Sequence, residues 1–201
     1  MPERIEITKM KQNSNNREYV IENVKKEGAL LEFASDELRD DKEIALEAIH
    51  NNPEALEFVS DRLKGDRQIV YDSVSKSGWT YCYARENLLE DKELLMAGLK
   101  ISGQILYFAA TDMRDDKDIV KQAVSSKPII IKYASSRLRE DKEIGIIAMQ
   151  KDKSCYEFLG EKLKKDEEIL QIKRMSPVQK IPGKIGTICG WDGKFPGLSE
   201  L

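Results

Sequence analysis

Hydrophobic residues recur along the chain with a period of 25 residues, and this spacing is the strongest feature of the sequence. Each period opens with a polar triplet followed by a large apolar residue, as in Asp41-Lys42-Glu43-Ile44. Related tetrads start at Asp66, Asp91, Asp116, Asp141 and Asp166, and a degenerate one starts at Asn16. A register held over seven starts without slippage indicates tandem structural units.

Each unit contains two apolar stretches when the first residue of its tetrad is counted as position 1. Positions 4, 5, 8 and 9 are mostly apolar or small, which is the pattern of one face of an α-helix. Positions 16, 19 and 23 form the second stretch, and position 18 is always aromatic. Gly or Pro stands between the stretches at position 13 in five of six units, because Gly permits open backbone angles and Pro cannot continue a helix. The unit is therefore predicted to be helix–turn–helix.

The polar positions support the same fold. Aspartate at position 1 is a good N-cap for the first helix, and the cations common at position 24 suit the C-terminus of a second one. Helices of about ten residues are marginal alone and must bury their apolar faces against neighbouring units. The pattern predicts an all-α fold, a right-handed-type α-solenoid of six helix–turn–helix repeats over residues 16–170.

The two ends lie outside this register. Residues 1–15 are expected to form an irregular N-terminal arm, in which residues 4–8 alternate like a short strand. Residues 171–201 hold five of the twelve glycines and three of the six prolines. Such a composition predicts an irregular C-terminal tail. This tail is expected to cap the last repeat, with a flexible or partner-bound segment as the alternative.

Composition narrows the class of function. The net charge of -3 provides no general attraction for nucleic acid or an anionic membrane, and no apolar run is long enough to span one. Cys82, Cys155 and Cys189 are odd in number and lack metal-binding spacing. They favour reduced thiols in a cytoplasmic protein without a metal or cofactor.

The repeated motif resembles the DUF4116 family, whose members carry tandem blocks of this kind. The resemblance is carried by segments such as residues 41–49, beginning Asp-Lys-Glu-Ile, and residues 56–63, which contain Phe58-Val59-Ser60, and it covers about residues 16–170. It implies a helical interaction module of the type found in bacterial, phage-like or pathogen-associated proteins. The family supplies no catalytic residues.

A partner surface is predicted on the second half of the central repeats. Positions 14, 17, 21 and 24 are mostly polar, but near the middle of the array they become apolar or aromatic. Exposed clusters of this kind mark protein interfaces. The residues predicted to bind a protein or nucleoprotein partner are Trp79, Cys82, Leu89, Tyr107 and Ile129 on this half, Tyr71 and Met96 on neighbouring first helices, and Trp191 in the tail. In the alternative interpretation they fill gaps between helices or meet the arm or tail.

Two other functions remain as alternatives. The Lys and Arg residues at positions 2 and 24 could follow the phosphates of RNA or a nucleoprotein, although caps and ion pairs between repeats also account for them. An enzyme with its site in the tail is the third hypothesis. Its support is small: His50 stands where other repeats carry Lys or Ser, and the segment 186–194 departs from the phosphate-loop pattern. We expect the protein not to be an enzyme.

Overall fold

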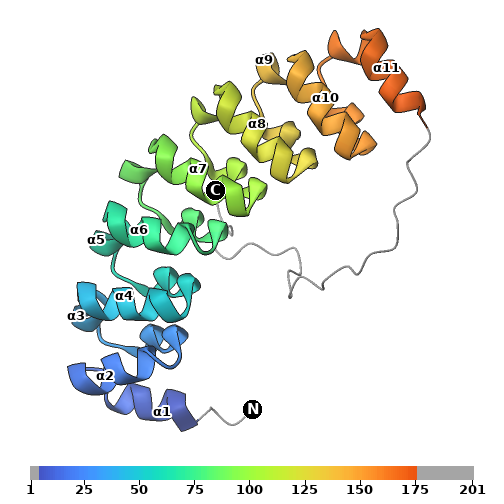
Figure 1. Cartoon of the computed structure of the whole chain (residues 1–201). Coiled ribbons are helices and arrows are strands. Elements are labelled where there is room, and N and C mark those ends of the chain that lie inside the picture. Colours follow the sequence, from blue (N-terminus) through green and yellow to red (C-terminus); the bar gives the residue numbers. More distant parts are fainter. Residues whose placement is uncertain (1–4, 176–201) are drawn as a thin grey trace, which may run out of the picture.

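A computed structural model describes residues 5–175 as helical repeats that stack side by side and bend into an arc (Figure 1). The first half of every repeat is an α-helix that begins directly after the position-1 residue. These helices are α2 Arg17–Val24, α4 Lys42–Asn51, α6 Arg67–Val74, α7 Lys92–Ile101, α8 Lys117–Ser126, α10 Lys142–Lys151 and α11 Glu167–Arg174. The prediction of an all-α repeat solenoid is confirmed.

The second half of each repeat differs from the single α-helix that was predicted. It is a six-residue 3-10 helix followed by one short helical turn. The 3-10 helices are η1 Gly28–Phe33, η2 Pro53–Phe58, η3 Gly78–Tyr83, η5 Gly103–Phe108, η7 Pro128–Tyr133 and η8 Lys153–Phe158. The short turns are α3 Asp36–Arg39, α5 Asp61–Lys64, η4 Glu86–Leu88, η6 Met113–Asp115, α9 Ser136–Arg139 and η9 Leu163–Lys165.

Local backbone and side-chain preferences explain this division. Position 19 is extended, with φ −68° and ψ 160° at Val59, which ends the 3-10 helix. Ser60 at position 20 then caps the short turn by accepting a hydrogen bond from the Leu63 N–H. A 3-10 helix has three residues per turn, so positions 16 and 19 share one side, and both are buried in most repeats.

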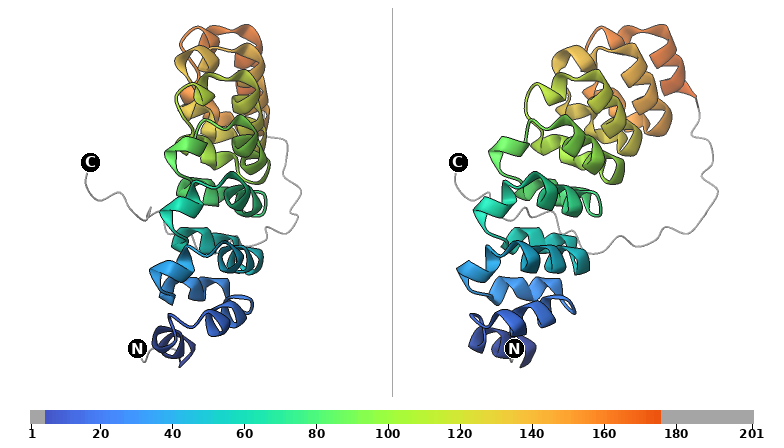
Figure 2. Two further views of the ribbon diagram at one scale, coloured as in Figure 1. Left: turned by 90° about the vertical axis from the view of Figure 1, so that its left-hand side faces the viewer. Right: turned by 60° about the vertical axis from the view of Figure 1, so that its left-hand side comes forward.

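The repeats form two layers with the core between them. Successive α-helices pack against one another, as do successive six-residue 3-10 helices, and each α-helix also packs on the 3-10 helix of its own repeat. Figure 2 shows this stacking from two further directions. Fully buried side chains such as Ile44, Ile49 and Leu56 fill the space between the layers. We call the row of 3-10 helices η1, η2, η3, η5, η7 and η8 the η layer.

The ends of the array also differ from the sequence prediction. Residues 5–12 form helix α1, Ile5–Gln12, so the predicted strand at residues 4–8 is wrong and the arm is not irregular there. Ile7 and Met10 lie one helical turn apart and pack on the core, with Met10 fully buried, which favours helix over strand. Because α1 contacts η1, it covers the exposed end of the first repeat. At the other end, α11 extends the helical array to Arg174, four residues beyond the predicted boundary. The remaining tail lies outside the described residues.

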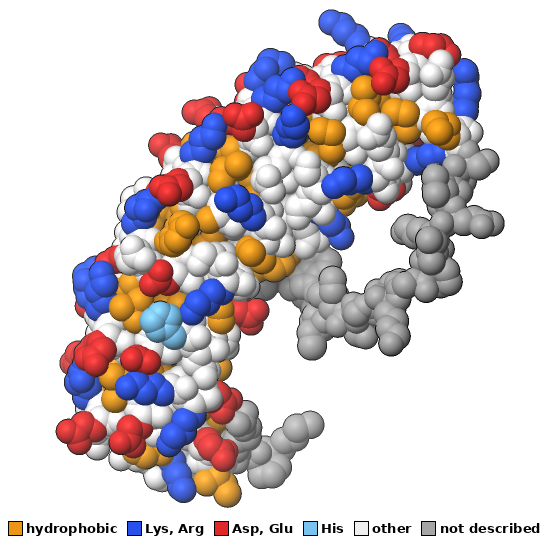
Figure 3. Space-filling view, in the orientation of Figure 1, with side chains coloured by type: hydrophobic (Ala, Val, Ile, Leu, Met, Phe, Trp, Pro, Cys, Tyr) orange, Lys and Arg blue, Asp and Glu red, His pale blue; other side chains and the backbone are white. Residues whose placement is uncertain are grey.

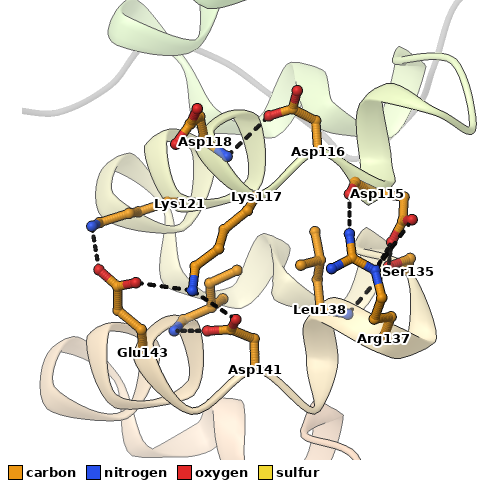
Figure 4. A network of polar contacts seen from close by, with 11 residues as sticks. Asp115, Asp116, Lys117, Asp118, Lys121, Ser135, Arg137, Leu138, Asp141 and Glu143 are labelled. Atoms are coloured by element: carbon orange, nitrogen blue, oxygen red, sulfur yellow. Dashed lines mark hydrogen bonds and ion pairs between the residues drawn. The ribbon is translucent and has the colours of Figure 1, made fainter.

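Ion pairs join each repeat to the next. The position-1 aspartate caps its own α-helix. It also forms an ion pair with the position-2 cation of the preceding repeat, as Figure 4 shows for Lys117 and Asp141. The six contacts are Arg17–Asp41 at 2.9 Å, Lys42–Asp66 at 2.7 Å, Arg67–Asp91 at 2.6 Å, Lys92–Asp116 at 2.6 Å, Lys117–Asp141 at 2.8 Å and Lys142–Asp166 at 3.0 Å. The hydrogen bond from Arg67 is the main reason that the pKa of Asp91 lies below its ordinary value. The stability that Asp91 contributes is therefore present above its ordinary pKa and is lost as the pH falls through the lowered one.

A second set of contacts joins the short turns of neighbouring repeats. Asp115 accepts hydrogen bonds from the Ser135 hydroxyl and from Arg137 Nε, as Figure 4 shows. Asp40 makes the same contacts with Ser60 and Arg62 three repeats earlier. The 25-residue register is thus held at the junctions by side chains as well as by the core.

Replacing Asp91 separates its two roles. We expect Asp91→Ala to lower the free energy of unfolding by about 1–2 kcal/mol, because the cap of α7 and the ion pair are both lost. Asp91→Asn keeps a capping oxygen and loses only a surface ion pair, so its cost is expected to be under about 1 kcal/mol. Urea unfolding followed by circular dichroism measures both. Equal losses for the two variants would contradict the dual role.

A glycine at position 13 allows close contact between repeats. None of the described glycines has a positive φ, so open backbone angles are not the reason for glycine here. A β-carbon on Gly78 would lie 2.5 Å from the Gly98 carbonyl oxygen of the next repeat, whereas one on Gly65 would lie 3.3 Å from the Asn87 side chain and 3.4 Å from the Arg62 carbonyl oxygen. We expect Gly78→Ala to destabilise the chain by about 1–3 kcal/mol, because backbone atoms must separate. The matched control Gly65→Ala should change stability much less, and equal thermal midpoints for the two variants would contradict this steric reason.

Candidate protein-binding surface

The outer side of the η layer carries a line of aromatic rings. Position 18 is aromatic in all six repeats, and each of these rings is half-buried against the core, with part of its surface left at the outside. Positions 14 and 17 eclipse each other in a 3-10 helix, because three residues complete one turn. They form an outer ridge beside the position-18 rings. The chemistry of this surface is therefore set by the residues at positions 14, 17 and 18.

Four aromatic side chains touch one another across repeats three to five. Trp79 meets Phe108 edge to face with ring centroids 6.1 Å apart. Tyr107 lies between Phe108, at 5.1 Å, and Tyr133, at 4.9 Å, again edge to face. We call Trp79, Phe108, Tyr107 and Tyr133 the aromatic row. With 39% of its surface exposed, Tyr107 makes the row accessible to a partner.

Of the seven residues predicted as partner-binding that the structure describes, four lie on the η layer and three do not. Trp79 and Cys82 are on η3, Tyr107 is on η5 and Ile129 is on η7, where Ile129 packs partly on the core. Cys82 is exposed.

The remaining predicted residues are spread over other parts of the chain. Tyr71 and Met96 belong to α6 and α7 in the α-helical layer, half-buried against the core. Leu89 follows η4 at the end of its repeat and also packs on the core. Trp191 lies outside the described residues. Three of the eight thus fit the alternative interpretation, in which such residues fill gaps between helices.

The sequence analysis missed Phe108 and Tyr133 as members of the surface. Both occupy position 18, whose aromatic residues were noted only as part of the repeat pattern. The residues next to them in the sequence could have indicated this. Tyr107 directly precedes Phe108. Lys132 directly precedes Tyr133 and follows Ile129 by one 3-10 turn. A 3-10 periodicity applied to positions 14–19 would have placed these side chains on adjacent ridges.

Acidic residues border the aromatic row on one side. Tyr83 donates its hydroxyl hydrogen bond to Glu57 Oε2 over 3.0 Å. Although Cys82 is exposed as a residue, neighbouring atoms crowd its thiol; this partial burial, followed by the negative charges of Glu57 and Glu54, raises the pKa of the thiol to about 11. Cys82 is accordingly a poor nucleophile at neutral pH, since the thiolate is the reactive form.

Most of the Lys and Arg residues that could follow nucleic-acid phosphates already contact other side chains. All six position-2 cations contact the aspartate of the following repeat, and the position-24 cations are half-buried beside their neighbours. On the face seen in Figure 3, Lys and Arg interleave with Asp and Glu along the array. The described residues therefore do not present these cations as an open phosphate-binding line.

Residues 5–175 offer few candidates for a chemical site. No group of three or more His, Cys, Asp or Glu side chains could hold a metal ion there. His50 is exposed near the end of α4. An open depression of about 290 Å³ is lined by Arg85, Glu86 and Asn87. None of the helices in this part of the chain has the length and apolarity needed to cross a membrane.

The reactivity of the Cys82 thiol depends on the acidic residues Glu54 and Glu57 beside the aromatic row. In a Cys189→Ser background, we expect its alkylation by iodoacetamide to rise with a midpoint near pH 11, because burial and the nearby carboxylates disfavour the thiolate. Glu57→Gln should move this midpoint to lower pH. Mass mapping of the labelled peptide distinguishes Cys82 from buried Cys155, and a midpoint at or below pH 9 would contradict the described surroundings.

A family model described as a domain of unknown function (DUF4116) matches residues 16–64, 66–114 and 116–164. Each match spans two structural repeats, so the family unit is a pair of the 25-residue units seen here. No curated protein and no solved structure matches the chain. Because the three matches cover most of its length, the chain belongs to the DUF4116 family.

Proposed function

We propose that the chain is a non-enzymatic protein-binding module, an adaptor or inhibitor, that docks a protein partner on the aromatic row. The observation that carries this proposal is the contact series Trp79–Phe108–Tyr107–Tyr133, which joins three repeats into one accessible surface. Free Cys82, exposed on the same surface, fits the reducing conditions of a cytoplasmic protein, and we propose that location as well.

An aromatic surface of this type suits protein recognition. Trp and Tyr bury large areas at a small cost in side-chain entropy, and they dominate the energetics of many interfaces. Edge-to-face contacts hold the rings of the row in place before a partner arrives. A preorganised surface loses less entropy on binding, which favours affinity.

Nucleic acid is the weaker candidate for the partner. A phosphate backbone would have to compete with the carboxylates that already contact the position-2 cations. It would also meet Glu54 and Glu57 beside the aromatic row. A protein partner faces neither obstacle.

The experiment is quantitative capture of binding partners from the native host with matched variants. Trp79→Ala/Tyr107→Ala is expected to lose the partner that the wild-type chain captures, with at least a tenfold loss of affinity, because two central anchors are removed. Ile101→Ala truncates an apolar side chain that is 53% exposed on α7, and it should bind normally.

Circular dichroism and urea unfolding determine whether the double variant still folds. Retained helicity with lost capture supports the proposal. Unchanged capture by the folded double variant would contradict it, and unfolding of the double variant would assign the two rings to the core instead.

A further inference from the structure

The η layer, together with the short turns that follow its helices, has an acidic end. In repeats one to three, the outward positions 14, 17 and 21 carry acids and no cations. These acids are Glu32, Asp36, Glu54, Glu57, Asp61 and Glu86. All are exposed except Glu57, which is half-buried. They lead directly to the aromatic row, since Trp79 and Cys82 occupy the same ridge in repeat three.

Nearby cations balance only part of this charge. Arg39 pairs with Asp36, and Arg85 Nη2 lies 3.2 Å from Asp61 Oδ2. Lys64 is half-buried close to Glu57 and Asp61. These three cations offset part of the charge of the six acids, and Lys11 lies 5.2 Å from the centre of the Phe33 ring in repeat one.

Two of the acids are available for a partner. Glu32 and Glu54 are exposed and form no ion pair with the residues that the structure describes. The field of Glu54 and Glu57 reaches Cys82, which places this charge at the border of the aromatic row.

Repeats four and five, which carry most of the aromatic row, differ from this acidic end. In repeats four and five the same outward positions hold uncharged residues and one cation, Lys132, whose ammonium lies 4.7 Å from the centre of the Tyr133 ring. In repeat six these positions hold Ser154, Glu157 and Glu161, and Glu161 pairs with Lys164, so acids also stand beyond the row, but fewer than the six of repeats one to three. The larger group of acids in repeats one to three favours placing the cations of a bound chain at this end.

We propose that the partner contributes a polypeptide segment in which a cluster of Lys or Arg adjoins a cluster of apolar or aromatic side chains. The apolar cluster lies on the aromatic row, and the cations extend over the acids of repeats one and two. This inference rests on the proposed function, because it names the chemistry of the partner at the same surface.

The test is selection of random displayed peptides on the full chain. Peptides of about 16 residues suffice, since at about 3.3 Å per residue they span four repeats spaced about 10 Å apart. Binders that also bind Trp79→Ala/Tyr107→Ala are removed. We expect the remaining peptides to contain Lys or Arg next to Trp, Phe, Tyr, Leu or Ile.

Charge reversal then tests the acidic end. For one selected peptide, Glu32→Lys/Glu54→Lys should weaken binding by roughly tenfold, and added salt should reduce the difference. The matched control Glu18→Lys/Glu22→Lys makes the same change of net charge on exposed positions of α2, in the other layer, and should have little effect.

The outcomes separate the two proposals. Peptides that depend on the aromatic row but lack cations, or that bind the two charge variants equally, would overturn this inference and leave the proposed function standing. If no peptide depended on the row, both proposals would fall. Light scattering on the free chain tests whether a second copy of the chain occupies the surface. A dimer that Trp79→Ala/Tyr107→Ala converts to a monomer would show this, and it would also overturn the inference.

Discussion

Stacking of neighbouring repeats at a fixed 25-residue register is the constraint on which this structure depends. No single repeat can bury both the inner face of its α-helix and the inner ridge of its 3-10 helix, so each uses its neighbours. The position-1 aspartate strengthens this dependence, because one carboxylate caps its own helix and binds a cation of the preceding repeat. Local folding and contact between repeats are therefore coupled at every junction.

The binding surface follows from the 3-10 geometry of the second layer. Three residues per turn align position 14 with 17, 15 with 18, and 16 with 19. The ridge of positions 16 and 19 is buried in most repeats. The ridge of positions 15 and 18 carries the half-exposed aromatic rings at position 18, and the ridge of positions 14 and 17 faces outward. Stacking then brings rings from different repeats together, as with Tyr107 and Tyr133. An α-helix in the same place would have separated these ridges and scattered the side chains.

Much of this architecture could be predicted from the sequence. The recurring Asp-Lys-Glu-Ile tetrad, with its degenerate copies, locates the start of the first α-helix of each repeat, because an N-cap followed by helical periodicity is a local signal. The second half of the repeat was harder, since positions 16, 19 and 23 fit both an α-helix and a 3-10 helix with a following turn. Residues 4–8 were misassigned for a related reason: a short alternating run resembles a strand until the burial of Met10 favours a helix.

The candidate surface could be predicted only in part. Trp79 and Tyr107 stand out because they replace polar residues at outward positions of the repeat. Tyr71 and Met96 also depart from the pattern, and the register places them in the first helices of their repeats; the structure shows that these helices form the other layer. Phe108 and Tyr133 are ordinary members of position 18, and only tertiary contact assigns them to the aromatic row.

The central claim is that stacking joins rings from three repeats into one surface. Nuclear Overhauser effects between aromatic protons in the free chain measure this most directly. The account predicts cross-peaks between Trp79 and Phe108 and between Tyr107 and Tyr133, whose ring centroids lie 6.1 Å and 4.9 Å apart. Resolved ring signals in a folded protein without these cross-peaks would contradict it.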